Sequence, residues 1–154
     1  MKTNFKTFEF SEAIKANAVK DDIFELLCPR REYDWIPHWE CEILHSVSGY
    51  NEKGCVFTTK NLTSEVPWVW LTQEFDKEKG IVRFAIFAAG LFVMDYTIKV
   101  IDTGSSSSEL EFNQIFRSIS SEGDKVVGSF TYDVLSKHIK PLESMLNEYL
   151  AKLQ

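Results

Sequence analysis

The sequence predicts an α+β domain in which a curved, seven-stranded antiparallel sheet wraps around a long C-terminal helix. Two observations predict this fold class. Seven segments of the 154-residue chain are rich in β-branched and aromatic residues and mostly alternate apolar with polar residues, as half-buried strands do. The last segment instead repeats apolar residues at steps of three and four, which is typical of an amphipathic helix. The strands can therefore bury one face of their sheet against that helix.

One strand and two short helices are predicted at the start of the chain. Phenylalanines alternate with polar residues within 4–16, which indicates a strand. Asn17 is expected to cap a helix over 18–27. Pro29 ends this helix, because the residue before a proline is disfavoured in the helical conformation. A second short helix or turn is expected over 30–36.

Six further strands with short connections follow, so we expect antiparallel pairing, because parallel strands need long crossovers. The predicted strands span 41–47, 54–60, 66–75, 80–87, 92–101 and 108–119. Alternation assigns an inward face to the last three strands, made of Val82, Phe84, Ile86, Met94, Tyr96, Ile98, Val100, Leu110, Phe112, Gln114 and Phe116. In 66–75 the pattern is ambiguous. Trp68 and Trp70 share one face, and the inward orientation is favoured over an exposed apolar patch.

The end of the chain is predicted to form one helix of about 30 residues, roughly 45 Å long. Its expected apolar stripe consists of Val127, Phe130, Val134, His138, Leu142, Met145, Tyr149 and Leu153. Pro141 should remove one helical hydrogen bond and bend the rod. We find no repeat and no linker, so 1–154 is expected to be a single domain. This order of elements describes a helix-grip fold.

Composition excludes some partners and favours others. The net charge of −6 and the lack of basic clusters argue against nucleic acid. The longest nearly uncharged stretch is too short to span a membrane, so no stable membrane insertion is expected. Three cysteines with no export signal predict free thiols in a cytoplasmic protein. We expect no cofactor, and the oligomeric state stays open.

The segment "CPRREYDWIPHWECEILHSVSGYNEKGCVF" (28–57) carries a resemblance to a known family. It is similar to a bacterial subgroup of the START-like superfamily (SRPBCC), which includes the birch pollen allergen and polyketide cyclases. The Cys-Pro, Arg-Glu-Tyr, Trp-Ile-Pro, Trp-x-Cys-Glu and Gly-Cys-x-Phe motifs carry this resemblance, and "LNEYL" (146–150) matches the subgroup's end. His38 departs from it, because a small residue is expected there. The resemblance implies binding of a hydrophobic small molecule, in some members with cyclisation or dehydration chemistry.

The function predicted from the sequence is therefore binding or carrying of a hydrophobic, aromatic or lipid-like molecule between sheet and helix. The alternatives are a polyketide cyclase or dehydratase using the same cavity, and a regulatory interaction module with a filled interior. The predicted ligand contacts are Trp35, Trp39, Trp68, Trp70, Phe84, Tyr96, Gln114, Phe116, Phe130 and His138.

Each of these contacts has a structural alternative. Trp35 and Trp39 could instead lock the short helix to the sheet. Tyr96 and Gln114 could instead bond each other across adjacent strands. His138 could be an ordinary core residue, although with Tyr96 and Glu42 it is a candidate for proton transfer in an enzyme.

No metal site is predicted. The only grouping worth testing comprises His38, Glu40, Cys41, Glu42 and His45. Alternation along a strand would scatter these side chains over opposite faces.

Overall fold

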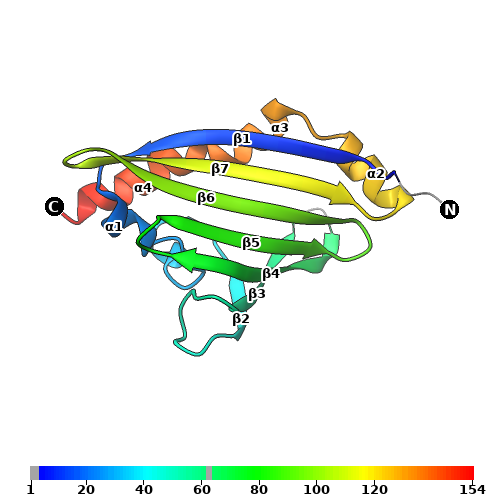
Figure 1. The fold of residues 1–154 in the computed structure, drawn as a ribbon, viewed down its shortest axis with the longest axis horizontal. Coiled ribbons are helices and arrows are strands. Elements are labelled where there is room, and N and C mark those ends of the chain that lie inside the picture. Colours follow the sequence, from blue (N-terminus) through cyan, green and yellow to red (C-terminus); the bar gives the residue numbers. More distant parts are fainter. Residues whose placement is uncertain (1–3, 62–63) are drawn as a thin grey trace.

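The computed structural model describes residues 4–61 and 64–154, and it contains the predicted sheet (Figure 1). The strands are β1 (Thr7–Ala16), β2 (Cys41–His45), β3 (Val56–Asn61), β4 (Ser64–Asp76), β5 (Ile81–Ala88), β6 (Phe92–Gly104) and β7 (Ser107–Ser118). All neighbours pair antiparallel, in the order β1-β7-β6-β5-β4-β3-β2. The seven-stranded antiparallel sheet is therefore confirmed.

The inward face of the sheet is also as predicted. Burial alternates strictly along β7 and along most of β6, and every residue predicted to face inward on β5, β6 and β7 is buried. Trp68 and Trp70 on β4 pack against this core. The inward orientation of the two indoles is thus settled, and the alternative of an exposed tryptophan patch is wrong.

The segment between β1 and β2 is less helical than predicted. It holds α1 (Lys20–Phe24) and a short 3₁₀ helix, η1 (Glu32–Asp34). Asn17 does not cap α1, because Val19 occupies the cap position without a side-chain bond. Asn17 instead follows the last residue of β1, and its N–H donates to Asn147 Oδ1 at 2.8 Å. The expected cap is wrong because α1 begins only at Lys20, so Asn17 lies two residues before the cap position.

The C-terminal helix is confirmed but is shorter than expected. It comprises α3 (Tyr132–Ile139) and α4 (Pro141–Lys152), preceded by a separate helix, α2 (Ser121–Gly128). Thr131 caps α3 by accepting a hydrogen bond from Val134 N at 3.2 Å, so the chain leaves the helical conformation before this residue. Pro141 separates α3 from α4, as its missing N–H predicts.

These breaks change which residues face the sheet. The buried positions of the three helices are Gly123, Val127, Leu135, Ile139, Leu146 and Leu150. Val134, His138 and Leu153 are exposed, so their assignment to the buried stripe is wrong. The stripe was extrapolated from Val127 through a continuous helix, whereas the cap at Thr131 starts a new helical register. In Figure 1, α3 and α4 run behind β1 and β7.

Helix side chains close the outer edge of β1. Backbone N–H groups of Lys6 and Lys15 donate to Asp124 Oδ1 (2.8 Å) and Glu143 Oε2 (2.7 Å). Asn147 Nδ2 donates to the Lys15 carbonyl at 3.0 Å. An edge strand otherwise presents unpaired backbone groups. The C-terminal helices are therefore fixed to the sheet by polar contacts as well as by packing.

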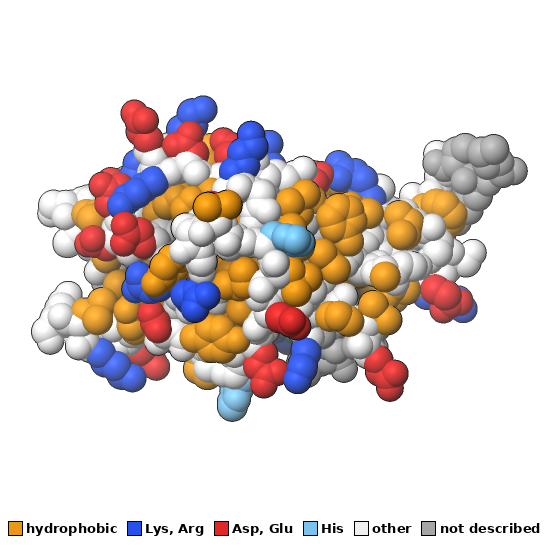
Figure 2. Space-filling view, turned by 90° about the horizontal axis from the view of Figure 1, so that it is seen from below, with side chains coloured by type: hydrophobic (Ala, Val, Ile, Leu, Met, Phe, Trp, Pro, Cys, Tyr) orange, Lys and Arg blue, Asp and Glu red, His pale blue; other side chains and the backbone are white. Residues whose placement is uncertain are grey.

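Several large apolar side chains reach the surface around β2, at the lower edge of Figure 1. They are Tyr33, Leu44, Val47 and Tyr50. The view from below shows hydrophobic side chains gathered along the middle of the molecule, with charged side chains mostly around them (Figure 2). Among the described residues no helix is long and apolar enough to cross a membrane.

Candidate ligand-binding site

Aromatic rings cover the middle of the inward face of the sheet. Trp70 on β4 lies at the centre of this group. Its ring centroid is 5.1 Å from that of Phe57, 5.2 Å from Phe84 and 5.9 Å from Tyr96. Phe112 extends the group across β7, 6.3 Å from Tyr96. We call these five residues the central aromatic cluster.

A second group of rings lies towards the end of the sheet near α2. Trp68 contacts Phe92 at 5.6 Å, and Phe92 contacts Phe116 at 5.3 Å. Phe130, in the break between α2 and α3, closes over Phe116 at 4.7 Å. The predicted ligand contacts Phe84, Phe116 and Phe130 are thus all on the interior, but they belong to two different groups.

The two inner tryptophans differ in how their N–H groups are satisfied. Trp70 Nε1 donates to Thr59 Oγ1 at 2.9 Å. Trp68 Nε1 is buried and has no hydrogen-bond partner among the described residues. A buried donor without a partner costs about 1–3 kcal/mol. Trp68 therefore offers a hydrogen bond that the protein itself does not use.

Tyr96 and Gln114 supply the buried polar groups on β6 and β7. They are register partners on neighbouring strands, and both are buried. Burial raises the pKa of Tyr96 well above its usual range, the nearby Glu32 carboxyl adds to this, and a hydrogen bond with Gln114 opposes it. The hydroxyl therefore keeps its proton at neutral pH. The strand register and the pKa of Tyr96 support the predicted interaction between the two side chains, and their contact with a ligand stays a prediction.

Trp35 and Trp39, in the 28–41 segment between α1 and β2, stabilise this corner of the chain by hydrogen bonds to backbone carbonyls. Trp35 Nε1 donates to the Leu26 carbonyl at 3.1 Å, and Trp39 Nε1 donates to the Pro29 carbonyl at 2.8 Å. Tyr33 Oη donates to the Cys41 carbonyl and accepts from the Cys41 N–H, at 3.1 and 3.0 Å. The structure therefore supports the locking role for Trp35 and Trp39, and their role as ligand contacts remains a prediction.

Glu32 belongs to the same 28–41 segment, but its carboxyl is desolvated. The sequence did not predict it as a site residue. Desolvation raises the pKa of its carboxyl to about 8. The carboxyl also contributes to the raised pKa values of Tyr96 and Cys41. Among the described residues its carboxyl oxygens have no hydrogen bond or ion pair. Glu32 is thus an acid of this corner without a charged partner among the described residues.

A signal for Glu32 was present in the sequence. In a 3₁₀ helix, residues three apart lie directly above one another. Glu32 is three residues before Trp35, which is buried. The neighbouring Arg31 pairs with Asp34 at 2.9 Å.

The other two candidates for proton transfer lie on the surface. Glu42 on β2 and His138 on α3 are both exposed, so neither shares the interior with Tyr96. Glu42 follows Cys41, whose side chain is the partly buried one, and the alternation of the strand turns Glu42 outward. The structure therefore does not bring the three predicted acid–base residues together.

The three cysteines are unpaired in the structure. Cys41 lies opposite Thr59 in the β2–β3 register rather than opposite Cys55. Burial raises the pKa of Cys55 to about 11 and also raises that of Cys41. Thiols are nucleophilic as thiolates, so these cysteines are poor candidates for covalent chemistry. No three His, Cys, Asp or Glu side chains of the described chain gather as a metal site.

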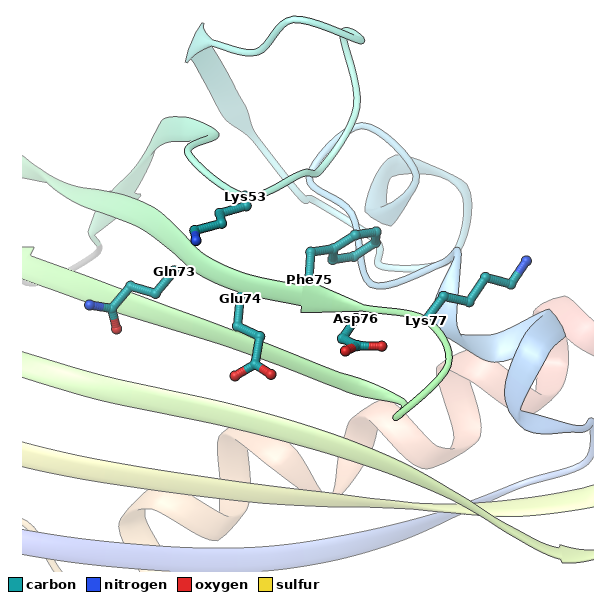
Figure 3. A pocket seen from close by; sticks show the side chains of 6 residues that line it. All are labelled: Lys53, Gln73, Glu74, Phe75, Asp76 and Lys77. Atoms are coloured by element: carbon teal, nitrogen blue, oxygen red, sulfur yellow. The ribbon is translucent and has the colours of Figure 1, made fainter.

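A surface pocket lies away from the aromatic interior, at the end of β4 (Figure 3). It is lined by Lys53, Gln73, Glu74, Phe75, Asp76 and Lys77. Its charges are largely matched within the protein, because Lys77 pairs with Glu25 at 2.7 Å and Arg83 lies 3.9 Å from Glu74. None of the predicted ligand contacts lines it, and we do not assign it a ligand.

Comparison with known proteins places this geometry in a structural class. No family model and no curated protein matches the sequence. The fold is similar to that of norcoclaurine synthase from Thalictrum flavum in complex with dopamine and hydroxybenzaldehyde, with a TM-score of 0.67 at 16% identity over 94% of this chain and 88% of that one.

Bacterial structures are similar to the same degree. The Zhui aromatase/cyclase from Streptomyces sp. R1128 gives a TM-score of 0.67 at 14% identity and covers 97% of both chains. An uncharacterised protein from Bacillus thuringiensis gives 0.61 at 13% identity, over 92% of this chain and 97% of that one. Identities this low show the fold alone. The chain therefore has the helix-grip fold that its sequence predicts, and it shares this fold with the proteins named above.

Proposed function

We propose that the protein binds a small hydrophobic molecule with an aromatic ring on the inward face of its sheet. The observation that carries this proposal is the unpartnered buried N–H of Trp68 in an otherwise apolar, ring-lined interior. Ligand sites are mostly apolar and contain a few polar groups that orient the ligand. A ligand oxygen or ring nitrogen would supply the acceptor that Trp68 lacks.

The structural neighbours support the same class of ligand. Norcoclaurine synthase is described with dopamine and hydroxybenzaldehyde, both small aromatic molecules, and the bacterial neighbour is an aromatase/cyclase. The rings of Trp68, Trp70 and Phe130 are only partly buried, although they face the core. The accessible part of these rings is available for stacking on a planar ligand.

The test compares tryptophans whose N–H groups differ in their partners. The probe is 2-(1-naphthyl)ethanol, and its binding is measured by titration calorimetry. Trp68→Phe should weaken binding about fivefold and leave the melting temperature nearly unchanged, because no internal hydrogen bond is lost. Trp39→Phe is the matched control. It removes the bond to the Pro29 carbonyl and should lower stability by about 1 kcal/mol without affecting binding. Equal binding by wild type and Trp68→Phe would contradict the proposal.

Acid–base catalysis on the bound molecule is the second candidate function, and Glu32 favours it. A carboxyl with a pKa of about 8 carries a proton at neutral pH and is suited to act as a general acid. The test follows bound aromatic β-hydroxy ketones by mass spectrometry. Wild type should release a product that has lost one water, and Glu32→Gln should bind the same compound unchanged. Because Glu32 and Tyr96 share no hydrogen bond in the structure, binding remains the first proposal.

A further inference from the structure

We infer that the ligand presents a carbonyl oxygen to the N–H of Trp68, and that it is therefore an aromatic ketone or aldehyde rather than an alcohol, an amine or an acid. This inference rests on the proposed function, since it requires that the inward face of the sheet receives a small molecule. It is carried by the polar groups at the end of the interior near α2, where one hydrogen-bond donor is free and the neighbouring hydroxyls are already used.

Trp68 lies in a group of rings that contributes no other polar atom. Its ring centroid is 5.6 Å from that of Phe92 at an interplanar angle of 80°, and Phe92 is 5.3 Å from Phe116 and 6.3 Å from Phe130. We call these four residues the outer aromatic group. Trp68 Nε1 is buried without a hydrogen-bond partner among the described residues. Because an indole nitrogen can only donate, the outer aromatic group lacks one acceptor and no donor.

The hydroxyls beside this group are already used within the protein. Ser118 is the register partner of Phe92, and its Oγ donates to the Ser120 carbonyl at 2.9 Å and accepts from the Ser120 N–H at 3.4 Å. Ser120 Oγ in turn donates to the Gly90 carbonyl. A ligand hydroxyl could accept from Trp68, but its own hydrogen would meet no free hydroxyl here. A buried donor without a partner weakens binding, so a carbonyl oxygen fits better than a hydroxyl.

The interior offers no positive charge to a ligand. Every lysine and arginine that the structure describes is exposed or half-buried. The buried polar side chains are neutral, namely Asn51, Thr59, Thr72, Ser108, Gln114 and Ser118. A carboxylate on this face would lose its hydration without gaining a cation, and an ammonium group would add hydrogens that the outer aromatic group cannot accept. The free donor therefore favours a neutral acceptor.

The carbonyl is directed to the outer aromatic group rather than to the central aromatic cluster. In the cluster, Trp70 Nε1 already donates to Thr59 Oγ1 at 2.9 Å. In the outer group, the rings of Trp68 and Phe130 keep some accessible surface. The Trp68 N–H itself is covered, so a ligand reaches it when a covering ring moves. Phe130 is the ring of this group best placed to move, because it lies in the break between α2 and α3 and not in a strand.

The test uses four probes that share the 1-naphthyl ring system and differ in their polar group: 1-acetylnaphthalene, 1-(1-naphthyl)ethanol, 1-ethylnaphthalene and 1-naphthoate. Titration calorimetry should show that wild type binds the ketone about tenfold more tightly than the alcohol, and the carboxylate most weakly. Trp68→Phe should weaken binding of the ketone about fivefold and leave that of the hydrocarbon within about twofold. Trp39→Phe is the matched control, because its N–H is committed to the Pro29 carbonyl, and it should keep the wild-type pattern.

The carbonyl group itself gives a second, independent readout. A hydrogen bond to a carbonyl oxygen moves the ¹³C resonance of the carbonyl carbon downfield. With 1-acetylnaphthalene labelled at this carbon, the bound resonance should lie further downfield in wild type and in Trp39→Phe than in Trp68→Phe. A tryptophan that only supports the packing of the site would not produce this difference.

The outcomes separate this inference from the proposed function. If wild type binds the alcohol or the carboxylate as tightly as the ketone, or if the bound carbonyl resonance is the same in wild type and Trp68→Phe, the inference is overturned. The proposed function then stands as long as Trp68→Phe weakens binding of the alcohol. If none of the four probes binds to wild type, both fail.

Discussion

Glu32 should make the protein less stable as the pH rises from about 4.5 to 8. An unfolded glutamate has an ordinary pKa of 4.5, and the folded protein raises it to about 8. Below pH 4.5 both states are protonated, so the residue has no effect. Between the two values the unfolded chain has lost the proton that the folded protein still holds. The free energy of unfolding therefore falls with pH through this window and levels off above pH 8.

The size of the effect follows from the two pKa values. Their difference, at about 1.4 kcal/mol per pKa unit, gives an upper value of roughly 5 kcal/mol. Because Glu32 is partly exposed, solvent screens its charge, and we expect about 2 kcal/mol. Few other groups compete in this window. Glu12, Glu25 and Glu52 have lowered pKa values, so their effects lie below pH 4.5. Cys55, with a pKa of about 11, acts above pH 8.

The assay is urea unfolding followed by tryptophan fluorescence at pH 5, 7 and 8.5, with wild type, Glu32→Gln and the exposed control Glu148→Gln. Glutamine resembles the protonated acid and cannot ionise. Glu32→Gln should exceed wild type by less than about 1 kcal/mol at pH 5 and by about 2 kcal/mol at pH 8.5. The control should follow wild type throughout. Parallel curves for wild type and Glu32→Gln would refute the desolvation of the Glu32 carboxyl.

Three further predictions concern the stability of the elements around the site. Glu12 on β1 accepts hydrogen bonds from Tyr132 and Ser136 on α3, and these bonds lower its pKa. Glu12→Gln should therefore lower the free energy of unfolding by about 1–2 kcal/mol at pH 7 and reduce the loss of stability that wild type shows below pH 4.5. Acid unfolding that is the same in both proteins would contradict this. His38 has a φ of +63°, a conformation that favours glycine, so His38→Gly should raise the free energy of unfolding by about 1 kcal/mol, whereas a loss of stability would show that the histidine side chain supports the turn. Truncation after Lys140 removes the buried Leu146 and Leu150 and should abolish cooperative thermal unfolding by circular dichroism; a cooperatively melting fragment would contradict the packing role of α4.

The sheet could be predicted from the sequence because its signals are local. Each strand from β5 to β7 carries its own alternation, and short loops leave antiparallel pairing as the available topology. His38 shows the same principle at a single position. The resemblance called for a small residue there, and the positive φ explains that requirement.

The C-terminal segment and the candidate site were harder to predict from the sequence, because the contacts that determine them are not local. Thr131 restarts the helical register, so extrapolation from Val127 placed His138 inside although it is exposed. Whether a given indole N–H is free depends on partners distant in sequence: Trp70 finds Thr59, and Trp68 finds none. Glu32 looks like an ordinary surface acid in the sequence, because the desolvation of its carboxyl arises only in the fold.

The most direct test of ligand binding on the inward face observes the four indole N–H groups separately. Protein labelled with ¹⁵N is titrated with 2-(1-naphthyl)ethanol, and the indole resonances are assigned with single Trp→Phe variants. Ring currents and a new hydrogen bond should move the Trp68 resonance most and the Trp70 resonance next, while Trp35 and Trp39, whose N–H groups already bond backbone carbonyls, should stay nearly fixed. Saturation with the probe while the Trp68 and Trp70 resonances remain in place would contradict binding in the aromatic interior.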